Sequence, residues 1–135
     1  MSLDIMTASY SVTVDPARDL VRITLSGFFD EAAVRGFLAA QSAAHAKLRC
    51  APNRHLTIAD VRGLAIQSQA VVARFHQAIA DPAAAGRRLG FVTTSSLARS
   101  QLRRAIGARD AAVFIDPAEA EAWVLAAVPA TEQAA

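Results

Sequence analysis

The first third of the chain opens on a simple alternation of apolar and polar residues. Every second residue from 10 to 14 is apolar, and the same period of two returns from 20 to 25. Asp and Pro residues at 15–19 separate the two stretches, as is typical of a turn. A period of two places alternate side chains on one face of a strand. The pattern therefore predicts a β-hairpin that ends at Ser26-Gly27.

Four later stretches have apolar residues at the three- and four-residue intervals of a helix. Each has a cap signal: Asp30 before the first, residues near Ser68 before the second, residues 93–96 before the third and Asp116-Pro117 before the fourth. Asp and Ser satisfy free backbone N–H groups at a helix start, and Pro fits its first position. We expect the second helix to stop at Asp81-Pro82 and the third at Gly107. The predicted inward residues are Val34, Phe37, Leu38, Gln41, His45 and Leu48, then Val71, Val72, Phe75 and Ile79, then Ala98, Leu102, Ala105 and Ile106, and finally Ala120, Trp123, Val124 and Ala127.

Short apolar runs at 55–60, 88–92 and 111–115 separate these helices and predict three more strands, with a loop at 61–63. Strands that alternate with helices imply parallel pairing through right-handed crossovers. The predicted fold class is α/β, in the order ββαβαβαβα. It has a single-layer, mixed, mostly parallel five-stranded sheet with four helices. We expect one domain at 9–128, between a flexible N-terminus (1–8) and a flexible tail (129–135).

Composition narrows the class of protein. The chain has 135 residues, 53% of them apolar, which favours a packed domain over disorder. A single cysteine, Cys50, excludes an internal disulfide framework and a Cys-rich metal site. No apolar run reaches the roughly 20 residues of a membrane helix, and no basic leader precedes one. We therefore expect a cytoplasmic protein without a transmembrane segment.

Three segments carry a resemblance to a known family. They are the hairpin closed by Leu25-Ser26-Gly27, the strand ending Leu56-Thr57-Ile58-Ala59-Asp60, and the terminal segment from Val113-Phe114-Ile115-Asp116-Pro117 through Glu121-Ala122-Trp123-Val124. In this order and spacing they resemble the SpoIIAA-like family of small bacterial proteins, with the STAS-type fold, over about residues 10–128. The resemblance implies a non-catalytic regulatory or protein-interaction module.

Relatives in the anti-sigma antagonist branch are phosphorylated on a Ser in an Asp-Ser-Ser-Gly run after the central strand. Here Asp60 and Gly63 match the approach to that run, but the run itself reads Ser68-Gln69-Ala70-Val71. Ala70 falls at the phosphorylated position, and only a gap would bring Ser68 into register. The resemblance thus implies a module without the phosphoserine switch. It also implies, loosely, binding of apolar ligands.

Two candidate binding segments follow from topology. Ligands of open α/β sheets collect at the carboxyl ends of the strands. Asp60, Arg62, Gly63 and Ser68 follow one predicted strand, and Thr94 and Ser95 follow the next. Both segments precede helix N-termini, which attract anions, and Arg62 adds a bidentate donor. Ordinary helix capping explains the Ser and Thr residues equally well.

No catalytic or metal-binding constellation emerges from the remaining polar residues. His45, His55 and His76 have no metal-ligand spacing, and His45 falls on an apolar stripe. Nothing indicates a lowered pKa for Cys50. The sequence has no nucleophile elbow, Walker loop or dinucleotide fingerprint. We expect no catalytic residue, no metal and no cofactor, and hence no enzyme.

Charge is unevenly distributed. Six of the thirteen arginines lie between Arg87 and Arg109 with no acid among them, whereas the chain from Ala111 onward has four acids and no base. Aromatic residues are too few for stacking on single-stranded nucleic acid, so no nucleic acid is expected as partner. The arginines are expected to form a solvated face that pairs with the acidic last helix, within the fold or in a homodimer.

These features favour a protein-interaction module whose partner binds around Asp60, Arg62, Gly63 and Ser68. The alternative is a carrier of a small amphiphile, such as a fatty acid, in an apolar crevice with its head group near Ser68 or Ser95. Phe28, Phe29, Phe75 and Trp123 are candidates to line that crevice, although such spacing is equally typical of a simple core.

Overall fold

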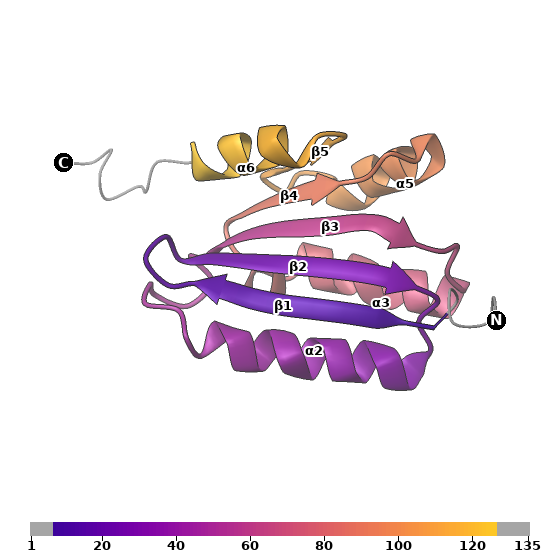
Figure 1. Ribbon diagram of the computed structural model, residues 1–135, viewed down its shortest axis with the longest axis horizontal. Coiled ribbons are helices and arrows are strands. Elements are labelled where there is room, and N and C mark those ends of the chain that lie inside the picture. Colours follow the sequence, from indigo (N-terminus) through magenta and orange to yellow (C-terminus); the bar gives the residue numbers. More distant parts are fainter. Residues whose placement is uncertain (1–6, 127–135) are drawn as a thin grey trace.

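A computed structural model describes residues 7–126 (Figure 1). Its strands and helices alternate as expected for an α/β domain. In chain order they are β1 (Ser9–Asp15), β2 (Leu20–Gly27), α2 (Glu31–His45), β3 (Leu56–Leu64), α3 (Gln69–Ala80), α4 (Pro82–Ala85), β4 (Arg88–Val92), α5 (Ser96–Ile106), β5 (Ala111–Phe114) and α6 (Pro117–Leu125). The predicted N-terminal segment 1–8, apart from Thr7 and Ala8, and the predicted tail 129–135 lie outside the described residues.

The five strands form one sheet whose spatial order follows the sequence, β1-β2-β3-β4-β5. β1 pairs antiparallel with β2, and β2, β3, β4 and β5 are parallel to one another. The predicted fold class, a mixed and mostly parallel five-stranded sheet, is confirmed. One consequence matters for function. All four parallel strands end at the same edge of the sheet, called the carboxyl edge below.

Helices cover both faces of the sheet, and each face has its own apolar core. On one face α2, α3 and α5 pack over alternate residues of the strands, among them Val21, Ile23 and Phe91. On the other face α6 packs over the intervening residues, among them Leu20, Ile58 and Val92. Figure 1 shows α2 running alongside β1, and α6 at the opposite side of the sheet. The predicted inward residues Val34, Phe37, Val71, Ile79, Ile106, Ala120 and Val124 are buried, whereas Ala127 lies outside the described residues.

The predicted helix caps are confirmed. Asp30, Ser68, Ser95 and Asp116 are the N-caps of α2, α3, α5 and α6, and each side chain accepts a hydrogen bond from a backbone N–H of the first turn. Gly107 is the C-cap of α5, with a φ of +54° that favours glycine. Local sequence therefore fixes where these helices begin and end.

Two expectations about the elements were wrong. The structure has a fifth helix, the single turn α4, because Asp81 ends α3 and caps the next turn at Pro82. The predicted loop at 61–63 is instead the last part of β3, where Gly63 pairs with Ser26 and Leu64 with Gly27. Because β2 extends to Gly27, residues of β3 beyond Asp60 still have backbone hydrogen-bonding partners.

Candidate functional site

The six predicted site residues all lie at the carboxyl edge, but on two sides of it. Asp60, Arg62 and Gly63 belong to β3, Ser68 caps α3, and Thr94 and Ser95 precede α5. Asp60 shares its face of β3 with Ile58, which packs under α6. The caps Ser68 and Ser95 belong to the helices on the opposite face. The topology therefore brings the residues to one edge without joining them into one pocket.

Asp60 and Arg62 form a bidentate ion pair at this edge. The Arg62 Nη2 lies 2.7 Å from Asp60 Oδ2, and Arg62 Nε donates to Asp60 Oδ1 at 3.0 Å. The Arg62 hydrogen bond lowers the pKa of Asp60, and the Asp60 carboxylate raises the pKa of Arg62. The Arg62 side chain remains 44% exposed. The pair is charged at neutral pH, and Arg62 keeps donor capacity toward solvent or a partner.

Gly63 lies where β2 and β3 approach closely. A Cβ at this position would meet the Ser26 Cβ at 2.7 Å, closer than real contacts allow. The register between β2 and β3 also shifts here, between Thr24 and Ser26. Gly63 therefore has a packing role that is sufficient to explain the residue.

The hydroxyl oxygens of Ser68 and Ser95 cap helices α3 and α5. Ser68 Oγ accepts from Val71 N at 3.2 Å, and Ser95 Oγ accepts from Ala98 N at 3.1 Å. The neighbouring Thr94 is exposed, whereas Thr93 is buried and its Oγ1 accepts from Ser95 N at 3.3 Å. Capping thus accounts for the serines at both helix starts.

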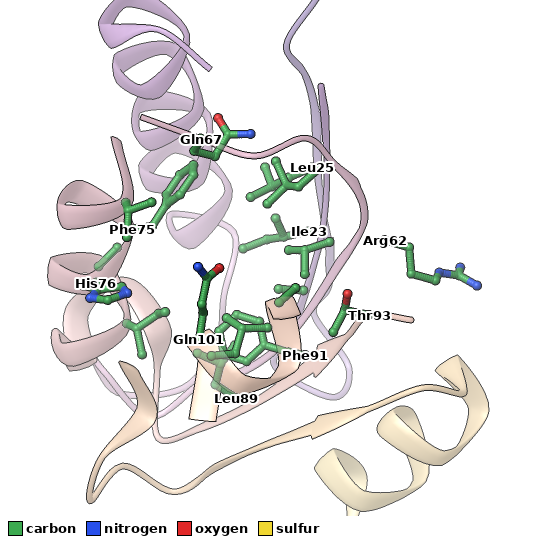
Figure 2. A pocket seen from close by; sticks show the side chains of 18 of the residues that line it. Ile23, Leu25, Arg62, Gln67, Phe75, His76, Leu89, Phe91, Thr93 and Gln101 are labelled. Carbon is green, nitrogen blue, oxygen red and sulfur yellow. The ribbon is translucent and has the colours of Figure 1, made fainter. Parts of the chain in front are cut away.

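A cleft of about 250 Å³ lies between the sheet and helices α3 and α5 (Figure 2). Its floor contains Ile23, Ala59 and Phe91, and α3 contributes Phe75. Of the four aromatic residues proposed to line a crevice, Phe75 lines this cleft. Phe29 is buried in the core, Phe28 is 39% exposed, and Trp123 packs against the core under α6 on the other face. Arg62 lies at the rim, but its guanidinium points away from the cleft (Figure 2).

Most residues lining this cleft are apolar, and none of them is Asp or Glu. Gln101 extends from α5 into it, and the exposed His76 lines the opposite wall on α3 (Figure 2). Sequence patterns gave no reason to select Gln101, because a single polar residue on an amphipathic helix is ordinary. Its position becomes informative only once α3 and α5 are placed side by side.

Gln67 fastens the loop between β3 and α3 to the end of β2. Its Oε1 accepts from Phe29 N at 2.8 Å, and its Nε2 donates to Gly27 O at 2.9 Å and to Ala65 O at 2.6 Å. The Gln67 side chain therefore forms hydrogen bonds with three backbone groups at the end of β2 and in the loop after β3. This clasp holds the loop that carries Ile66, and no sequence motif predicts it.

Large hydrophobic side chains are exposed along the same edge. Among the described residues they are Ile66 at 84%, Leu97 at 55%, Ile115 at 53%, Tyr10 at 40% and Phe28 at 39%. Phe28 follows β2, Ile66 follows β3, Leu97 begins α5 after β4, and Ile115 follows β5. Tyr10 pairs with Leu25, near the end of β2. The four residues that follow strand ends extend across the carboxyl edge, and they are called the apolar row below: Phe28, Ile66, Leu97 and Ile115.

The remaining candidates for chemistry lie at the opposite edge. His45 and His55 are in ring contact, and burial raises the pKa of the Cys50 thiol, with Asp19 adding to the shift. Among residues 7–126, no group of three or more His, Cys, Asp or Glu is placed to hold a metal ion. None of the helices in this range is long and apolar enough to cross a membrane.

The expected pairing with the last helix holds for Arg88, which donates to the Trp123 carbonyl oxygen at 2.7 Å and lies over the Trp123 ring; none of the ion pairs among residues 7–126 joins α5 to α6. Glu121 of α6 pairs with Arg22 at 2.9 Å and with Arg18 at 3.7 Å, both from the hairpin. The hairpin rather than α5 lies beside that part of α6. Arg103 and Arg104 of α5 are exposed, and Arg99 is half-buried.

Neither a protein-family model nor a curated protein matches this sequence. Solved structures do match. An uncharacterized protein of the DUF3478 family from Shewanella loihica, with a SpoIIAA-like fold, superposes with a TM-score of 0.69 at 13% identity, covering 87% of this chain and 95% of that one. The chain has a SpoIIAA-like fold.

A second solved structure also matches the fold of this chain. An anti-sigma factor antagonist from Mycobacterium paratuberculosis superposes with a TM-score of 0.57 at 13% identity, covering 86% of this chain and 94% of that one. The similarity covers nearly the whole of both chains, so it concerns the complete domain. At this identity it shows the fold alone.

Proposed function

We propose that this protein is a non-catalytic regulatory module that binds a partner protein through its carboxyl edge. One observation carries the proposal: four of the five exposed large hydrophobic side chains of the described residues, the apolar row, lie at that edge. Scattered exposed hydrophobics need no explanation, but a row confined to one edge is typical of an interaction site. The similarity in fold to an anti-sigma factor antagonist supports a regulatory role.

Ile66 makes the strongest case within the row. It is 84% exposed, although burying such a side chain gains roughly 1.5–3 kcal/mol. The Gln67 clasp holds its loop in place by three hydrogen bonds. An apolar side chain on a rigid support at a surface is well suited to enter a pocket of a partner without a large entropy cost.

The proposed module works without the phosphoserine switch. Ala70 stands at the position of the phosphorylated residue, and Ser68 is the N-cap of α3 with its oxygen engaged at Val71 N. In this proposal Asp60, Arg62, Ser68, Thr94 and Ser95 form the polar part of the surface, and Gly63 lies beside Arg62 in β3. Binding then depends on surface complementarity alone.

The test is affinity capture from the source cells with wild-type protein and three variants. Ile66→Ser removes the centre of the row, Arg62→Ala removes the exposed guanidinium, and Ala43→Ser is a control at an exposed position of α2. We expect one protein to be retained by wild type and Ala43→Ser and to be lost or weakened in the other two. A partner retained equally by all four proteins would contradict the proposal.

A second candidate function is supported by the cleft. Its volume of about 250 Å³ exceeds that of an apolar cavity known to hold benzene, about 150 Å³, and falls just short of drug-sized pockets, roughly 300–1,000 Å³. An amphiphile with an apolar part of about ten heavy atoms fits this size. Gln101 and Ser95 at the mouth offer neutral donors to its head group.

Fatty acids of increasing chain length test the carrier role by competition with a fluorescent fatty acid. The carrier account expects saturable binding with a maximum at medium chain length, and its loss in Ala98→Leu, which fills the cleft. Ser100→Leu, on α5 but not in the cleft, is the control. Affinity that rises steadily with chain length, or that ignores Ala98→Leu, would exclude the cleft as the site.

A further inference from the structure

The carboxyl edge has a negative net charge, although the chain as a whole has a positive one. Five carboxylates lie in the strand ends, loops and first helical turns of this edge, against three guanidinium groups including Arg74, which reaches Glu31. The net charge of the edge is thus −2, while the whole chain carries +2. The carboxylates are Asp30, Glu31, Asp60, Asp116 and Glu119, and the other two cations are Arg62 and Arg99.

Two of the three cations are already neutralised within the edge. Arg62 pairs with Asp60 at 2.7 Å, and Arg74 pairs with Glu31 at 2.9 Å. Asp30, Asp116 and Glu119 have no ion-pair partner among residues 7–126, and all three are exposed. Arg62 also attracts Asp116, and Arg99 is the remaining cation of the edge. The charge that a partner meets is therefore negative.

These carboxylates flank the apolar row. Asp30 follows Phe28 by two residues at one end, and Asp116 follows Ile115 directly at the other. Both are N-caps, so their side chains are fixed by hydrogen bonds to Ala33 N at 2.8 Å and Ala118 N at 2.9 Å. A surface with an apolar centre and charges at defined places on its rim resembles the usual anatomy of a protein interface.

The same charges disfavour two other occupants. An anionic lipid surface would be repelled by the exposed carboxylates. A second copy docking edge to edge would bring carboxylates against carboxylates, since a two-fold axis places the same patch on both sides. A cationic protein surface gains attraction at both ends of the row and faster association.

We infer that the partner is a protein whose contact surface combines an apolar centre with a cationic rim, placed to meet Asp30, Asp116 and Glu119. This inference rests on the proposed function and specifies the chemistry of its partner. It also fixes an orientation, because the basic remainder of the chain, including the exposed Arg103 and Arg104 of α5, repels the same surface.

Two synthetic amphipathic peptides with the same leucine pattern serve as probes, one with lysine and one with glutamate at every polar position. Binding to the full chain is measured by fluorescence anisotropy. We expect the lysine peptide to bind at least tenfold more tightly than the glutamate peptide. Its affinity should fall several-fold between about 50 mM and about 0.5 M salt, because exposed charges are screened.

Variants locate the binding on the edge. Ile66→Ser/Leu97→Ser should weaken binding of the lysine peptide at least tenfold. Phe28→Ser/Ile115→Ser, at residues of the row that do not line the cleft, should do the same, and Ala43→Ser should have no effect. Glu119→Gln should weaken it several-fold, whereas Gln77→Lys, which changes the charge equally on the exposed side of α3, should weaken it less. Thermal unfolding confirms that each variant is folded.

The outcomes separate the two proposals. If the Ile66→Ser/Leu97→Ser variant binds both peptides as wild type does, the docking edge itself is wrong. If the variant loses binding but the glutamate peptide binds wild type as tightly as the lysine peptide, only the cationic partner is wrong. Saturable binding to vesicles of anionic lipid through Ile66, or a dimer that dissociates in the same variant, would also overturn the inference.

Discussion

His45 and His55 bring their imidazole rings to a centroid separation of 4.3 Å at the amino edge of the sheet. His55 is 2% exposed, and its Nε2 lies 3.4 Å from the Ala84 carbonyl oxygen. The Nε2 of His45 is buried without a hydrogen-bond partner among the described residues. The His55 ring also lies against Gly86, so the pair has little room to separate.

This pair predicts that the protein loses stability in mild acid. Burial lowers the pKa of His45 to about 4, with repulsion from His55 adding to the shift, and burial also lowers the pKa of His55. In the unfolded chain both histidines have a pKa near 6.5. Below that pH the unfolded chain therefore binds more protons at these residues than the folded chain does. The stabilisation is complete above about pH 6.5 and disappears as the pH falls toward about 4.

Urea unfolding between pH 4.5 and 7.5 measures this effect. We expect a loss of about 1–2 kcal/mol toward the acid end, a figure discounted for the partial exposure of His45. His45→Phe should flatten the pH profile, and His76→Gln, at an exposed histidine, should leave it unchanged. An unaltered profile in His45→Phe would show that the pair does not control acid stability.

The Gln67 clasp predicts a large effect from a half-buried polar residue. Gln67→Ala removes three hydrogen bonds and leaves the N–H of the fully buried Phe29 without its acceptor. An unsatisfied buried donor costs about 1–3 kcal/mol, so the free energy of unfolding should fall by about that amount. Gln77→Ala, at an exposed position of α3, should change it by less than about 0.5 kcal/mol. Equal effects of the two variants would exclude the clasp.

Two glycines with positive φ predict different costs for the same substitution. Gly86 has a φ of +79°, and a Cβ there would collide with the His55 carbonyl oxygen, whereas Gly107 has a φ of +54° and a Cβ there would have no neighbouring atom within 4 Å. Gly107→Ala should cost about 1–3 kcal/mol from backbone strain alone, because a φ of +54° with a ψ of −122° is rarely adopted by a residue with a Cβ. Gly86→Ala should cost clearly more, because the backbone must also move. Chemical denaturation compares the two, and a smaller loss at Gly86 would contradict this packing.

Ser68 distinguishes a capping residue from a regulated one. Ser68→Ala should destabilise the protein by about 1 kcal/mol, because Val71 N loses its acceptor. Ser68→Asp should keep the stability, since Asp is an equally good N-cap. Both variants should bind the captured partner as wild type does. If Ser68→Asp alone lost binding of the partner, this result would indicate a phosphorylation switch at Ser68 and contradict the prediction.

Local patterns predicted the elements well because they depend on neighbours in sequence. The caps Asp30, Ser68, Ser95 and Asp116 lie next to the helices they start. By contrast, α4 was missed because Asp81 serves two helices at once, and the end of β3 was missed because its partner, Gly27, is 37 residues from Leu64 in sequence. Pairing between distant segments leaves no local signature.

The candidate site was predictable in position but not in character. Topology correctly brought Asp60, Arg62, Ser68 and Ser95 to one edge. The exposure of Ile66 and Leu97 was not predictable, because an apolar residue at a helix start or in a short loop is as easily buried as exposed. The sequence also cannot reveal that Gln67 reaches back to Phe29, 38 residues away.

The central claim, that a partner binds at the carboxyl edge, is tested most directly by a photoreactive amino acid placed at position 66 in living cells. The same residue at position 43, on the exposed side of α2, is the control. The account predicts a specific crosslinked protein from position 66 that is absent from position 43. No crosslink at 66, or the same products from both positions, would contradict it.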